Sequence, residues 1–365
     1  AALIHVRDAV SWNAMLSTYV EQFEGAKALQ SFVQLHKEGI EPNEMTFVMA
    51  LQACCQLTEM KECFIDEQMT FEMMTLQIGQ ALHEDVWRRG FASSVFVGTA
   101  LLTMYGKCGA VLEAENIFAA LPVRDVVSWN ALISGYIESG DNEWALKCFE
   151  EMQLEGLLPD IVTFVFTMNV CGNVGAISKG TEIHAAITRK GLLEGDFSIG
   201  CSLVDMYAKF GWLTIAKQVF DKLPLHNVVS WNSLIMGYAQ FGESITALEG
   251  FEQMLKEGVK PDEVTFIIIL NACSRARLFA ESHAYFESMS KDYGIVPAAE
   301  HHSCIVDNLS RMGQIHEAIW MIKKLPFSIY GATWNTVLDA CKTVGNVGLG
   351  NYAFHHLVCP TQSSC

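Results

Sequence analysis

The sequence contains no apolar run of about 18 residues, the length that a membrane-spanning helix needs. The longest candidate, residues 161–177, is interrupted by two threonines and two asparagines, so we expect a soluble protein. An initiator methionine and a basic, serine-rich leader are also missing. We therefore expect that any targeting segment lies outside this sequence.

Positive charge is scarce. The chain has 24 Lys and Arg against 41 Asp and Glu, which gives a formal net charge of −17. Nucleic-acid binders are usually basic, so this composition counts against RNA or DNA unless the basic residues gather on one surface. Hydrophobic residues make up 51% of the chain, which is enough to bury a substantial core.

Paired metal-binding cysteines are missing, because no Cys-x-x-Cys sequence occurs. The clusters His301-His302-x-Cys304 and His355-His356-x₂-Cys359 lack the paired spacing of a structural zinc site. No phosphate-binding loop, dinucleotide fingerprint or nucleophile elbow is present. We therefore expect no metal, no cofactor and no catalytic residue.

Cysteine itself is abundant, and twelve cysteines in a secreted chain would indicate a disulfide framework. However, four of them lie inside apolar stretches with helical spacing: Cys54, Cys171, Cys273 and Cys341. A free thiol in such a stretch behaves as a small buried hydrophobe. We predict reduced core cysteines, as in a reducing compartment.

The strongest pattern in the sequence is an internal repeat. The segment 126–160, VVSWNALISGYIESGDNEWALKCFEEMQLEGLLPD, recurs at 228–262 as VVSWNSLIMGYAQFGESITALEGFEQMLKEGVKPD, and a related copy occupies 9–43. A second string at 101–125 matches 203–227 with the same offset along the chain. A larger unit made of three motifs is therefore repeated.

Each motif holds two apolar patterns with helical spacing, separated by a turn signal such as Gly140-Asp141 or Gly242-Glu243. This pattern predicts a helix–turn–helix hairpin. Neither helix can bury its apolar face alone, so successive hairpins stack and form a long concave surface. We predict an all-α fold, a right-handed α-solenoid superhelix of stacked hairpins.

The repeat divides the chain into an N-terminal piece, nine motifs and a C-terminal hairpin. Residues 1–8 are predicted to be the tail of a preceding short motif, and residues 331–365 a partial hairpin with a divergent tail. The nine motifs are 9–43, 44–94, 95–125, 126–160, 161–196, 197–227, 228–262, 263–298 and 299–330.

One motif, 44–94, is longer than its counterparts 161–196 and 263–298, and the excess lies near 58–75. We interpret this insertion as an extended segment between helices or as an artefact of splicing or of the gene model. A docking element for a partner is the alternative.

Four features recur along the chain: alternating motif lengths, Val-Ser-Trp-Asn openings, the Met-Tyr-x-Lys-x-Gly sequence of the short motif and Gly-x-x-Pro-Asp endings. Together they resemble the PLS subfamily of pentatricopeptide repeat (PPR) proteins of plant organelles. Residues 269–313 are similar to the closing long and short motifs of that family, and the hairpin from 331 to the start of its E domain. Tetratricopeptide repeats have a 34-residue unit and a W-x₂-L-G-x₂-Y signature, whereas Trp is followed directly by Asn here.

The resemblance implies binding of single-stranded RNA at about one base per repeat, read by two or three side chains. In the family, the fifth and last residues of a motif address the base. Here these pairs are Asn13 with Asn43, Thr99 with Asp125, Asn130 with Asp160, and Asn232 with Asp262. They imply a pyrimidine, then G, then U, then U. The long motifs carry Val48, Val165 and Ile267 at the fifth position, which cannot hydrogen-bond a base edge.

A purely structural interpretation of the same residues exists, because Asn is a good helix cap and Pro-Asp a good turn. Recurrence at both family positions favours RNA contact. By analogy with the family, the second residues Val10, Val127 and Val229 flank and stack on bases. The tryptophans are predicted instead to pack between hairpins, because their neighbours are core residues; they are Trp12, Trp129, Trp231 and Trp334.

The resemblance implies a site-recognition factor for C-to-U editing, or for other processing, of transcripts in the mitochondrion or, alternatively, the chloroplast. Editing enzymes of the family carry a zinc deaminase with an H-x-E and a P-C-x-x-C sequence. Only His36-Lys37-Glu38 matches, so we expect a non-enzymatic monomer that recruits a deaminase in trans, together with editing accessory proteins that bind the long motifs.

The alternative is a helical-repeat scaffold for protein–protein interaction, which the net charge of −17 and the insertion favour. A groove without basic residues, together with burial of Asn130 and Asn232, would point to this alternative.

Overall fold

The computed structural model describes residues 8–59, 71–193, 196–323 and 330–358, and every regular element within these ranges is a helix. The chain divides into two compact units, Ala1–Ile183 and His184–Cys365. Helix α10 (Ile177–Arg189) contains the boundary between them.

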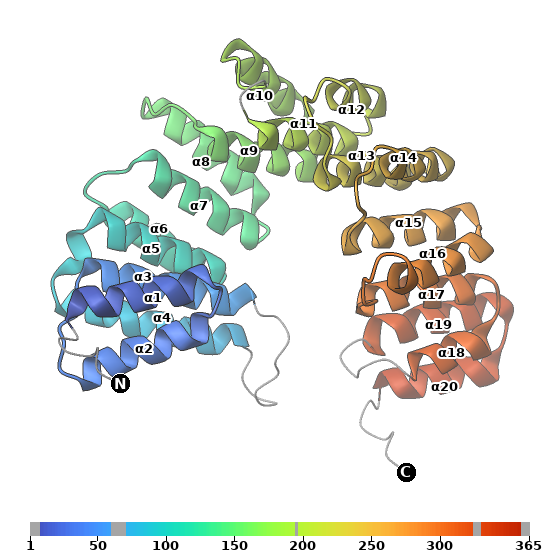
Figure 1. The fold of residues 1–365 in the computed structure, drawn as a ribbon, viewed down its shortest axis with the longest axis horizontal. Coiled ribbons are helices and arrows are strands. Elements are labelled where there is room, and N and C mark those ends of the chain that lie inside the picture. The colour runs from blue at the N-terminus through green and yellow to red at the C-terminus, as the bar shows by residue number, and fades with distance from the viewer. Residues whose placement is uncertain (1–7, 60–70, 194–195, 324–329, 359–365) are drawn as a thin grey trace. The chain divides into compact units, whose positions relative to one another are not determined.

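The first unit is a stack of helix hairpins, each with a first and a second helix (Figure 1). The first helices α1, α3, α5, α7 and α9 pack against one another in chain order, and α2, α4, α6 and α8 each pack against the first helix of their own hairpin. The elements are α1 (Ala9–Glu21), α2 (Gly25–Lys37), α3 (Glu44–Glu59), α4 (Phe71–Arg88), η1 (Phe91–Ser93), α5 (Val95–Lys107), α6 (Val111–Ala120), α7 (Val126–Glu138), α8 (Asn142–Leu154) and α9 (Ile161–Val174).

The second unit repeats this arrangement. Its first helices α11, α13, α15, α17 and α19 pack in chain order, and each is paired with the helix that follows it. The elements are α11 (Phe197–Lys209), α12 (Leu213–Phe220), α13 (Val228–Gln240), α14 (Ser244–Lys256), α15 (Glu263–Ala276), α16 (Phe279–Lys291), α17 (Ala299–Arg311), α18 (Ile315–Ile322), α19 (Tyr330–Val344) and α20 (Val347–Val358). The predicted all-α solenoid of stacked hairpins is thus confirmed within each unit.

Capping residues fix where the first helices begin. At α7, the Ser128 N–H donates to Asp125 Oδ1 (2.8 Å) and the Asp125 N–H donates to Ser128 Oγ (3.0 Å). The first N–H groups of a helix have no partner within the helix, so this reciprocal capping box stabilises its start. Equivalent boxes form at Asp160, Asn227 and Asp262.

Glycine supports the hairpin turns that the sequence predicts. Gly140 has φ = 81° and Gly242 has φ = 86°. Both values lie in the left-handed region, which costs glycine little because it has no Cβ. The second helices α8 and α14 begin two residues after these glycines.

Tryptophans fill the space between successive hairpins. Trp129 of α7 is buried and meets Phe118 of α6 edge-on, with ring centroids 4.6 Å apart. In the second unit, Trp231 of α13 meets Phe220 of α12 at the same 4.6 Å. The prediction that these tryptophans pack between hairpins is confirmed, and Trp12 and Trp334 are buried as well.

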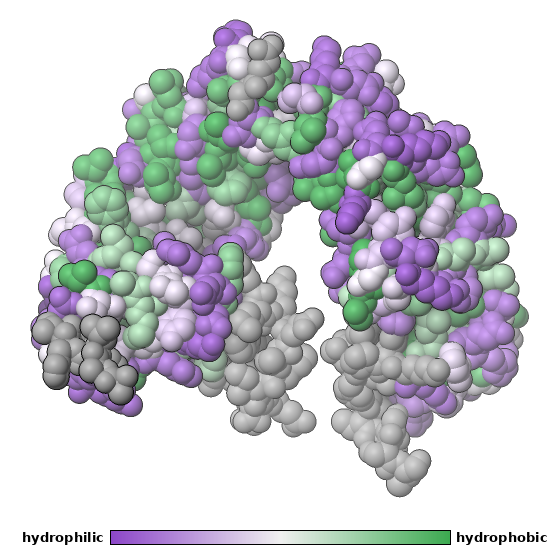
Figure 2. All heavy atoms as spheres, in the orientation of Figure 1, coloured by the Kyte–Doolittle hydropathy of each residue, from purple (hydrophilic) through white to green (hydrophobic). Residues whose placement is uncertain are grey.

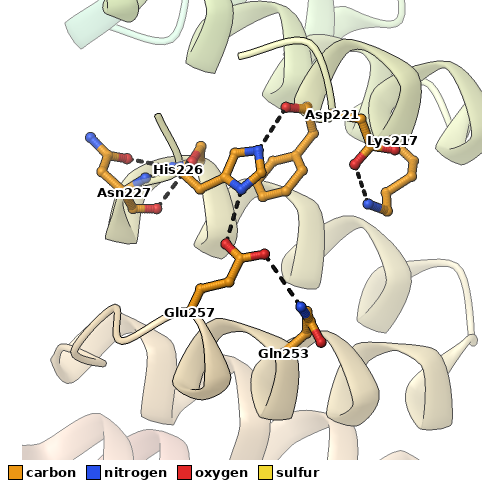
Figure 3. A network of polar contacts seen from close by, with 8 residues as sticks. Lys217, Asp221, His226, Asn227, Gln253 and Glu257 are labelled. Carbon is orange, nitrogen blue, oxygen red and sulfur yellow. Dashed lines mark hydrogen bonds and ion pairs between the residues drawn. The ribbon is translucent and has the colours of Figure 1, made fainter. Parts of the chain in front are cut away.

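A polar side-chain contact also joins neighbouring hairpins in each unit. In the second unit, His226 Nδ1 lies 2.9 Å from Glu257 Oε2, and His226 Nε2 lies 3.1 Å from the main-chain oxygen of Phe220 (Figure 3). Both ring nitrogens face acceptors, so both bonds form together only when the imidazole is protonated. The counterpart in the first unit joins Arg124 to Glu155 at 3.3 Å.

The cysteines are free thiols within the described ranges. Burial raises the pKa of Cys54 to about 12 and the pKa of Cys171 to about 11. Cys273 and Cys341 are buried too, and burial raises the pKa of both. All four therefore stay protonated near neutral pH, as predicted for reduced core cysteines.

The motif with the predicted insertion has longer helices than its neighbours. Helix α3 has 16 residues and α4 has 18, against 13 in both α1 and α2 of the preceding motif. Thr58 belongs to α3, and residues 71–75 belong to α4. The remainder of the insertion, 60–70, lies outside the described residues, as does the predicted tail from residue 359.

The surface carries apolar as well as polar side chains. Figure 2 shows hydrophobic residues over α8 and α9, next to hydrophilic ones. Leu154 at the end of α8 is 86% exposed, and Trp144 in the same helix is half exposed. None of the helices in the described ranges combines the length and the apolarity needed to span a bilayer.

Candidate nucleic-acid interface

A polar cluster joins the start of α7 to the start of the next first helix, α9. Asn130 Nδ2 donates to Asp160 Oδ1 (3.0 Å), and Asn130 Oδ1 accepts from Thr163 Oγ1 (2.7 Å). The Thr163 N–H donates to the same Asp160 oxygen (2.8 Å). Side chains of consecutive motifs therefore meet, because one complete hairpin returns the chain to the next first helix.

The same cluster occurs three times in the described residues. Asn232, Asp262 and Thr265 reproduce it in the second unit, with distances of 3.0 Å, 2.7 Å and 2.8 Å for the three bonds in the same order. In the first unit, a version with two asparagines has distances of 3.0 Å, 2.7 Å and 3.0 Å; it consists of Asn13, Asn43 and Thr46. We call these groups the three polar clusters.

Each cluster leaves some of its hydrogen-bonding capacity unused. The bonds described above engage one of the two hydrogens on Asn130 Nδ2, and they engage Asp160 Oδ1 but not Oδ2. Asp160 is exposed, whereas Asn130 is 7% exposed and Asn232 is 9% exposed. A cluster can therefore present one N–H donor and one further carboxylate or amide atom to a ligand.

The carboxylates of the clusters are ionised at neutral pH. Burial, the largest influence, would raise the pKa of Asp160, but bonds from the Thr163 N–H and hydroxyl and from Asn130 outweigh it and hold the pKa below its ordinary value of 3.8. The pKa of Asp262 is lowered in the same way by Thr265 and Asn232, against the effect of burial. Asp160 and Asp262 therefore act only as acceptors.

The fourth predicted pair does not form such a cluster. No hydrogen bond joins Thr99 to Asp125, although the structure describes both residues. The Thr99 main-chain oxygen accepts from Thr103 Oγ1, and Asp125 caps α7. Ser128 occupies the place of the threonine, and its hydroxyl donates to the main-chain oxygen of Asp125 (2.8 Å).

Exposed apolar side chains accompany the clusters. Val10, Val127 and Val229, the second residues of α1, α7 and α13, are 72%, 60% and 54% exposed. Other first helices also have an exposed apolar second residue, which the sequence analysis missed although the register gave the signal: Met45, Phe96, Val162 and Val264. An apolar surface group thus recurs in both units at one helix position.

Positive charge lies at the other end of the first helices. Lys107, Lys209 and Arg311 are the last residues of α5, α11 and α17, where cations interact favourably with the helix dipole. Each forms an ion pair: Lys107 with Glu138 (3.1 Å), Lys209 with Asp205 (2.8 Å) and Arg311 with Asp307 (2.7 Å). Acidic partners therefore compensate these three cations.

The histidine cluster at the start of α17 has a capping role. His301 is buried, its Nδ1 accepts from the Ala298 N–H (3.1 Å), and its Nε2 lies 2.9 Å from the main-chain oxygen of Glu263. The first bond makes Nδ1 the acceptor, so Nε2 carries the proton and donates. Among the described residues, no three His, Cys, Asp or Glu side chains gather in a way that could hold a metal.

A family model described as "PPR repeat family" matches residues 7–56, 124–173 and 226–275, and a second model, "PPR repeat", matches 264–293. This chain contains pentatricopeptide repeats. Residues of all three polar clusters lie within the matched segments.

Similar proteins in Arabidopsis thaliana also contain these repeats. The chain is 35% identical over 353 residues to one pentatricopeptide repeat-containing protein, covering 96% of this chain and 46% of the relative. It is 34% identical over 348 residues to the protein "CRR2, chloroplastic" (95% and 51%) and 34% identical over 355 residues to a relative named as mitochondrial (92% and 37%). The PPR chain thus spans about half, or less, of these relatives.

Solved structures show the same fold. Against PPR10 from maize, the TM-score is 0.61 at 17% identity, covering 97% of this chain and 54% of PPR10. Against PPR10 in complex with an 18-nt psaJ RNA element, the TM-score is 0.71 at 16% identity, with 99% and 52% covered. At this identity the likeness concerns the helical solenoid alone.

Proposed function

We propose that this PPR chain binds single-stranded RNA in a plant organelle and selects a site for C-to-U editing or for other transcript processing. The observation that carries the proposal is the recurrence of the three polar clusters. Each sits at the start of a first helix, beside an exposed valine, and in each the threonine N–H lies 2.8 Å or 3.0 Å from the oxygen of the cap residue. A helix cap alone requires the aspartate or asparagine, but not the second asparagine that is hydrogen-bonded to it.

The unused atoms of the clusters match the edges of pyrimidines. Uracil offers an N3–H donor next to carbonyl acceptors, and it is complemented by the ionised Asp160 Oδ2 and the free Asn130 N–H. In the first cluster, the Thr46 N–H fixes Asn43 Oδ1 in the cap (3.0 Å), which leaves the Asn43 amide nitrogen as a donor. Cytosine has an acceptor at N3, so this cluster favours cytosine among the pyrimidines. The assignment of guanine to the motif of Thr99 and Asp125 rests on the family resemblance alone.

The exposed valines provide apolar surface for the flat faces of the bases. Unstacked bases in single-stranded RNA bury these faces against protein side chains. Val127 and Val162 are the second residues of successive first helices in the first unit, so a base read by the cluster of Asn130 has an apolar group available on each side.

The role in editing rests on the motif pattern. The alternation of longer and shorter motifs indicates the PLS subfamily, and residues 331–365 resemble the start of an E domain. In this proposal the chain supplies no catalysis, a deaminase acts in trans, and accessory proteins bind the long motifs, whose fifth residues are Val48, Val165 and Ile267. We place the monomeric protein in the mitochondrion, with the chloroplast as the alternative, since relatives carry both descriptions.

Selection from randomised single-stranded RNA tests the proposal. The purified chain should enrich pyrimidine-n-G-U-n-n-U, read 5′ to 3′ along the repeats from N- to C-terminus. The variant Asn232→Ala should lose enrichment at the last U only, whereas Leu154→Ser, on an exposed second-helix position, should enrich the same sequence as the wild type. A folded wild-type chain that enriches no spaced G or U contradicts RNA recognition by these residues.

A protein-binding scaffold is the second candidate. Burial of Asn130 and Asn232 favours it, as do the net charge of −17 and the ion pairs of Lys107, Lys209 and Arg311. RNA affinity depends on cations that neutralise phosphates, so a scaffold should bind RNA weakly at every sequence. Equal, weak retention of all RNAs in the same selection would support this candidate.

A further inference from the structure

The third residue of each of six first helices is a serine or a threonine, and the two types bond differently. Ser11, Ser128 and Ser230 stand in α1, α7 and α13, whereas Thr46, Thr163 and Thr265 stand in α3, α9 and α15. The hydroxyls of Ser128 and Ser230 donate to main-chain oxygens of their own caps (2.8 Å and 3.0 Å). Ser11 Oγ likewise bonds its cap residue, Asp8 (2.7 Å).

Each threonine hydroxyl lies between two acceptors, one on the preceding hairpin and one on its own cap. The Oγ1 atoms of Thr46, Thr163 and Thr265 lie 2.7 Å from Oδ1 of Asn13, Asn130 and Asn232, respectively. They lie 2.9 Å, 2.8 Å and 2.8 Å from Oδ1 of the cap residues Asn43, Asp160 and Asp262. All three threonines are fully buried, so their hydroxyls must find a partner inside the protein. The third residue of a first helix is thus a threonine where the preceding motif has Asn at its fifth position. It is a serine where the fifth residue of the preceding motif is Thr99 or Cys201.

These bonds determine which way the asparagine amide is turned. An amide has two orientations that exchange its oxygen and its nitrogen. Asp160 Oδ1 can only accept, so it requires Asn130 Nδ2. The single hydroxyl hydrogen of Thr163 has two acceptors within reach, Asn130 Oδ1 (2.7 Å) and Asp160 Oδ1 (2.8 Å). Because Asp160 Oδ1 already accepts from Asn130 Nδ2 and from the Thr163 N–H, this hydrogen is the donor available to Asn130 Oδ1. The opposite orientation would place two oxygen acceptors against each other. The oxygen of the amide is therefore held inside the cluster, and only N–H is left for a ligand.

We propose that Thr46, Thr163 and Thr265 are positioning residues that determine base specificity. Each buried hydroxyl holds the asparagine oxygen away from the base. Without the hydroxyl, the amide oxygen has no donor inside the cluster, and only the bond from Nδ2 to the cap residue still opposes turning of the amide. A fraction of the amides then turn their oxygen towards the base. An amide oxygen that faces the base accepts from the amino group of cytosine, which uracil lacks. This inference rests on the proposed function of the clusters.

The discriminating measurement is the ratio of affinities for two RNAs that differ in one base. The RNA is the sequence selected by the full wild-type chain, with U or C at the base that responds to Asn130. Thr163→Val keeps the shape but removes the hydroxyl, and the U-to-C ratio should fall by about five-fold or more. Thr163→Ser keeps the hydroxyl and should retain the wild-type ratio. An unchanged ratio in Thr163→Val overturns the proposal.

Ser230→Ala is the matched control. It removes a hydroxyl from the same helix position, but one that bonds only its own cap, so the ratio at each base should stay as in the wild type. A fall in Ser230→Ala equal to that in Thr163→Val would show a general effect of helix starts and overturn positioning. Circular dichroism checks the fold of every variant.

Two further variants cover the case in which Thr163→Val does not fold. Thr163→Ala and Thr265→Val repeat the comparison, the latter in the second unit. If none of the three folds, the threonine has a structural role and the proposal is overturned. Failure of the proposed function is visible earlier, as a wild-type chain that selects no RNA, whereas failure of this inference leaves the wild-type selection intact.

Discussion

Asp160→Asn should change the base that its repeat binds while leaving the fold intact. Asp160 is an exposed residue. The substitution replaces Oδ2 by an amide nitrogen and keeps Oδ1, which accepts from Asn130 (3.0 Å) and from the Thr163 N–H (2.8 Å). The chain already contains this arrangement, because Asn43 accepts from Asn13 and the Thr46 N–H, both at 3.0 Å. Asn and Asp cap helices about equally well, so the free energy of unfolding should change by less than about 0.5 kcal/mol.

The effect on RNA should be much larger. In the wild type, the carboxylate of Asp160 accepts from uracil N3–H, and a hydrogen bond to a charged group contributes about 1.5 to 3 kcal/mol. In the variant, the amide N–H at position 160 faces uracil N3–H, and two donors cannot bond each other. The affinity for uracil should therefore fall roughly 10- to 150-fold. Cytosine offers an acceptor at N3, and its affinity should rise relative to uracil.

Asp160→Ala is the comparison that separates structure from recognition. It removes both oxygens, which costs about 0.5 to 2 kcal/mol for the lost cap and about 1 to 3 kcal/mol for the buried Asn130 N–H left without an acceptor. The two losses together amount to about 1.5 to 5 kcal/mol, which corresponds to a Tm lower by roughly 3 to 20 °C in a unit of this size.

Thermal melting by circular dichroism and fluorescence anisotropy with paired U and C RNAs measure the two effects separately. The reasoning predicts that Asp160→Asn melts like the wild type and prefers C at this base, whereas Asp160→Ala melts earlier and prefers neither. If Asp160→Asn lowers the Tm as much as Asp160→Ala, the cap argument is wrong. If it melts normally but still prefers U, the carboxylate does not read the base.

Further predictions concern stacking, acid stability and helix packing. Val127→Ser should weaken RNA binding several-fold with an unchanged Tm, since Val127 is exposed; Leu154→Ser is the control, and equal effects of the two would contradict base stacking. The pKa of Asp160 is lower in the folded state than its ordinary value, so the ionised carboxylate stabilises the fold. This stabilisation is complete above a pH of about 4 and is lost as the pH falls through the folded-state pKa. The urea midpoint should therefore fall less between pH 5 and pH 3 in Asp160→Asn than in the wild type. An equal fall in both proteins would refute the coupling between the ionisation of Asp160 and stability. Gly106→Ala places a Cβ 2.8 Å from the Gly135 Cα of the neighbouring first helix. Overpacking should lower the free energy of unfolding by about 1 to 3 kcal/mol, and the better helix propensity of alanine should offset about 0.5 to 1 kcal/mol of this loss. A urea midpoint equal to that of the wild type would show that α5 and α7 can separate.

Much of the fold could be predicted because its signals are local and repeated. Asp125 and Asn227 mark helix starts, since a cap needs only residues within one turn. The matching positions of Trp129 and Trp231 in their repeats predicted equivalent places in the stack, and both rings meet a phenylalanine at 4.6 Å. The long helices α3 and α4 were harder to predict, because the insertion near 58–75 has no counterpart in the other motifs.

The candidate site was predicted less completely. The sequence identified Asn130 with Asp160 and Thr99 with Asp125 on equal terms, but only the first pair is hydrogen-bonded. The two motifs differ at the fifth residue, Thr99 against Asn130, and the helices that follow them differ at the third residue, Ser128 against Thr163. Nothing in the spacing indicated that the threonine hydroxyl would cross to the neighbouring hairpin.

The sequence by itself therefore determined the repeat, the helix starts, the turns and the apolar faces, because each depends on residues within one hairpin and recurs in register. The tertiary structure decided how the polar side chains of consecutive hairpins meet. The orientation and the burial of the Asn130 amide depend on side chains from different motifs. These side chains come into hydrogen-bonding distance only when two first helices pack side by side.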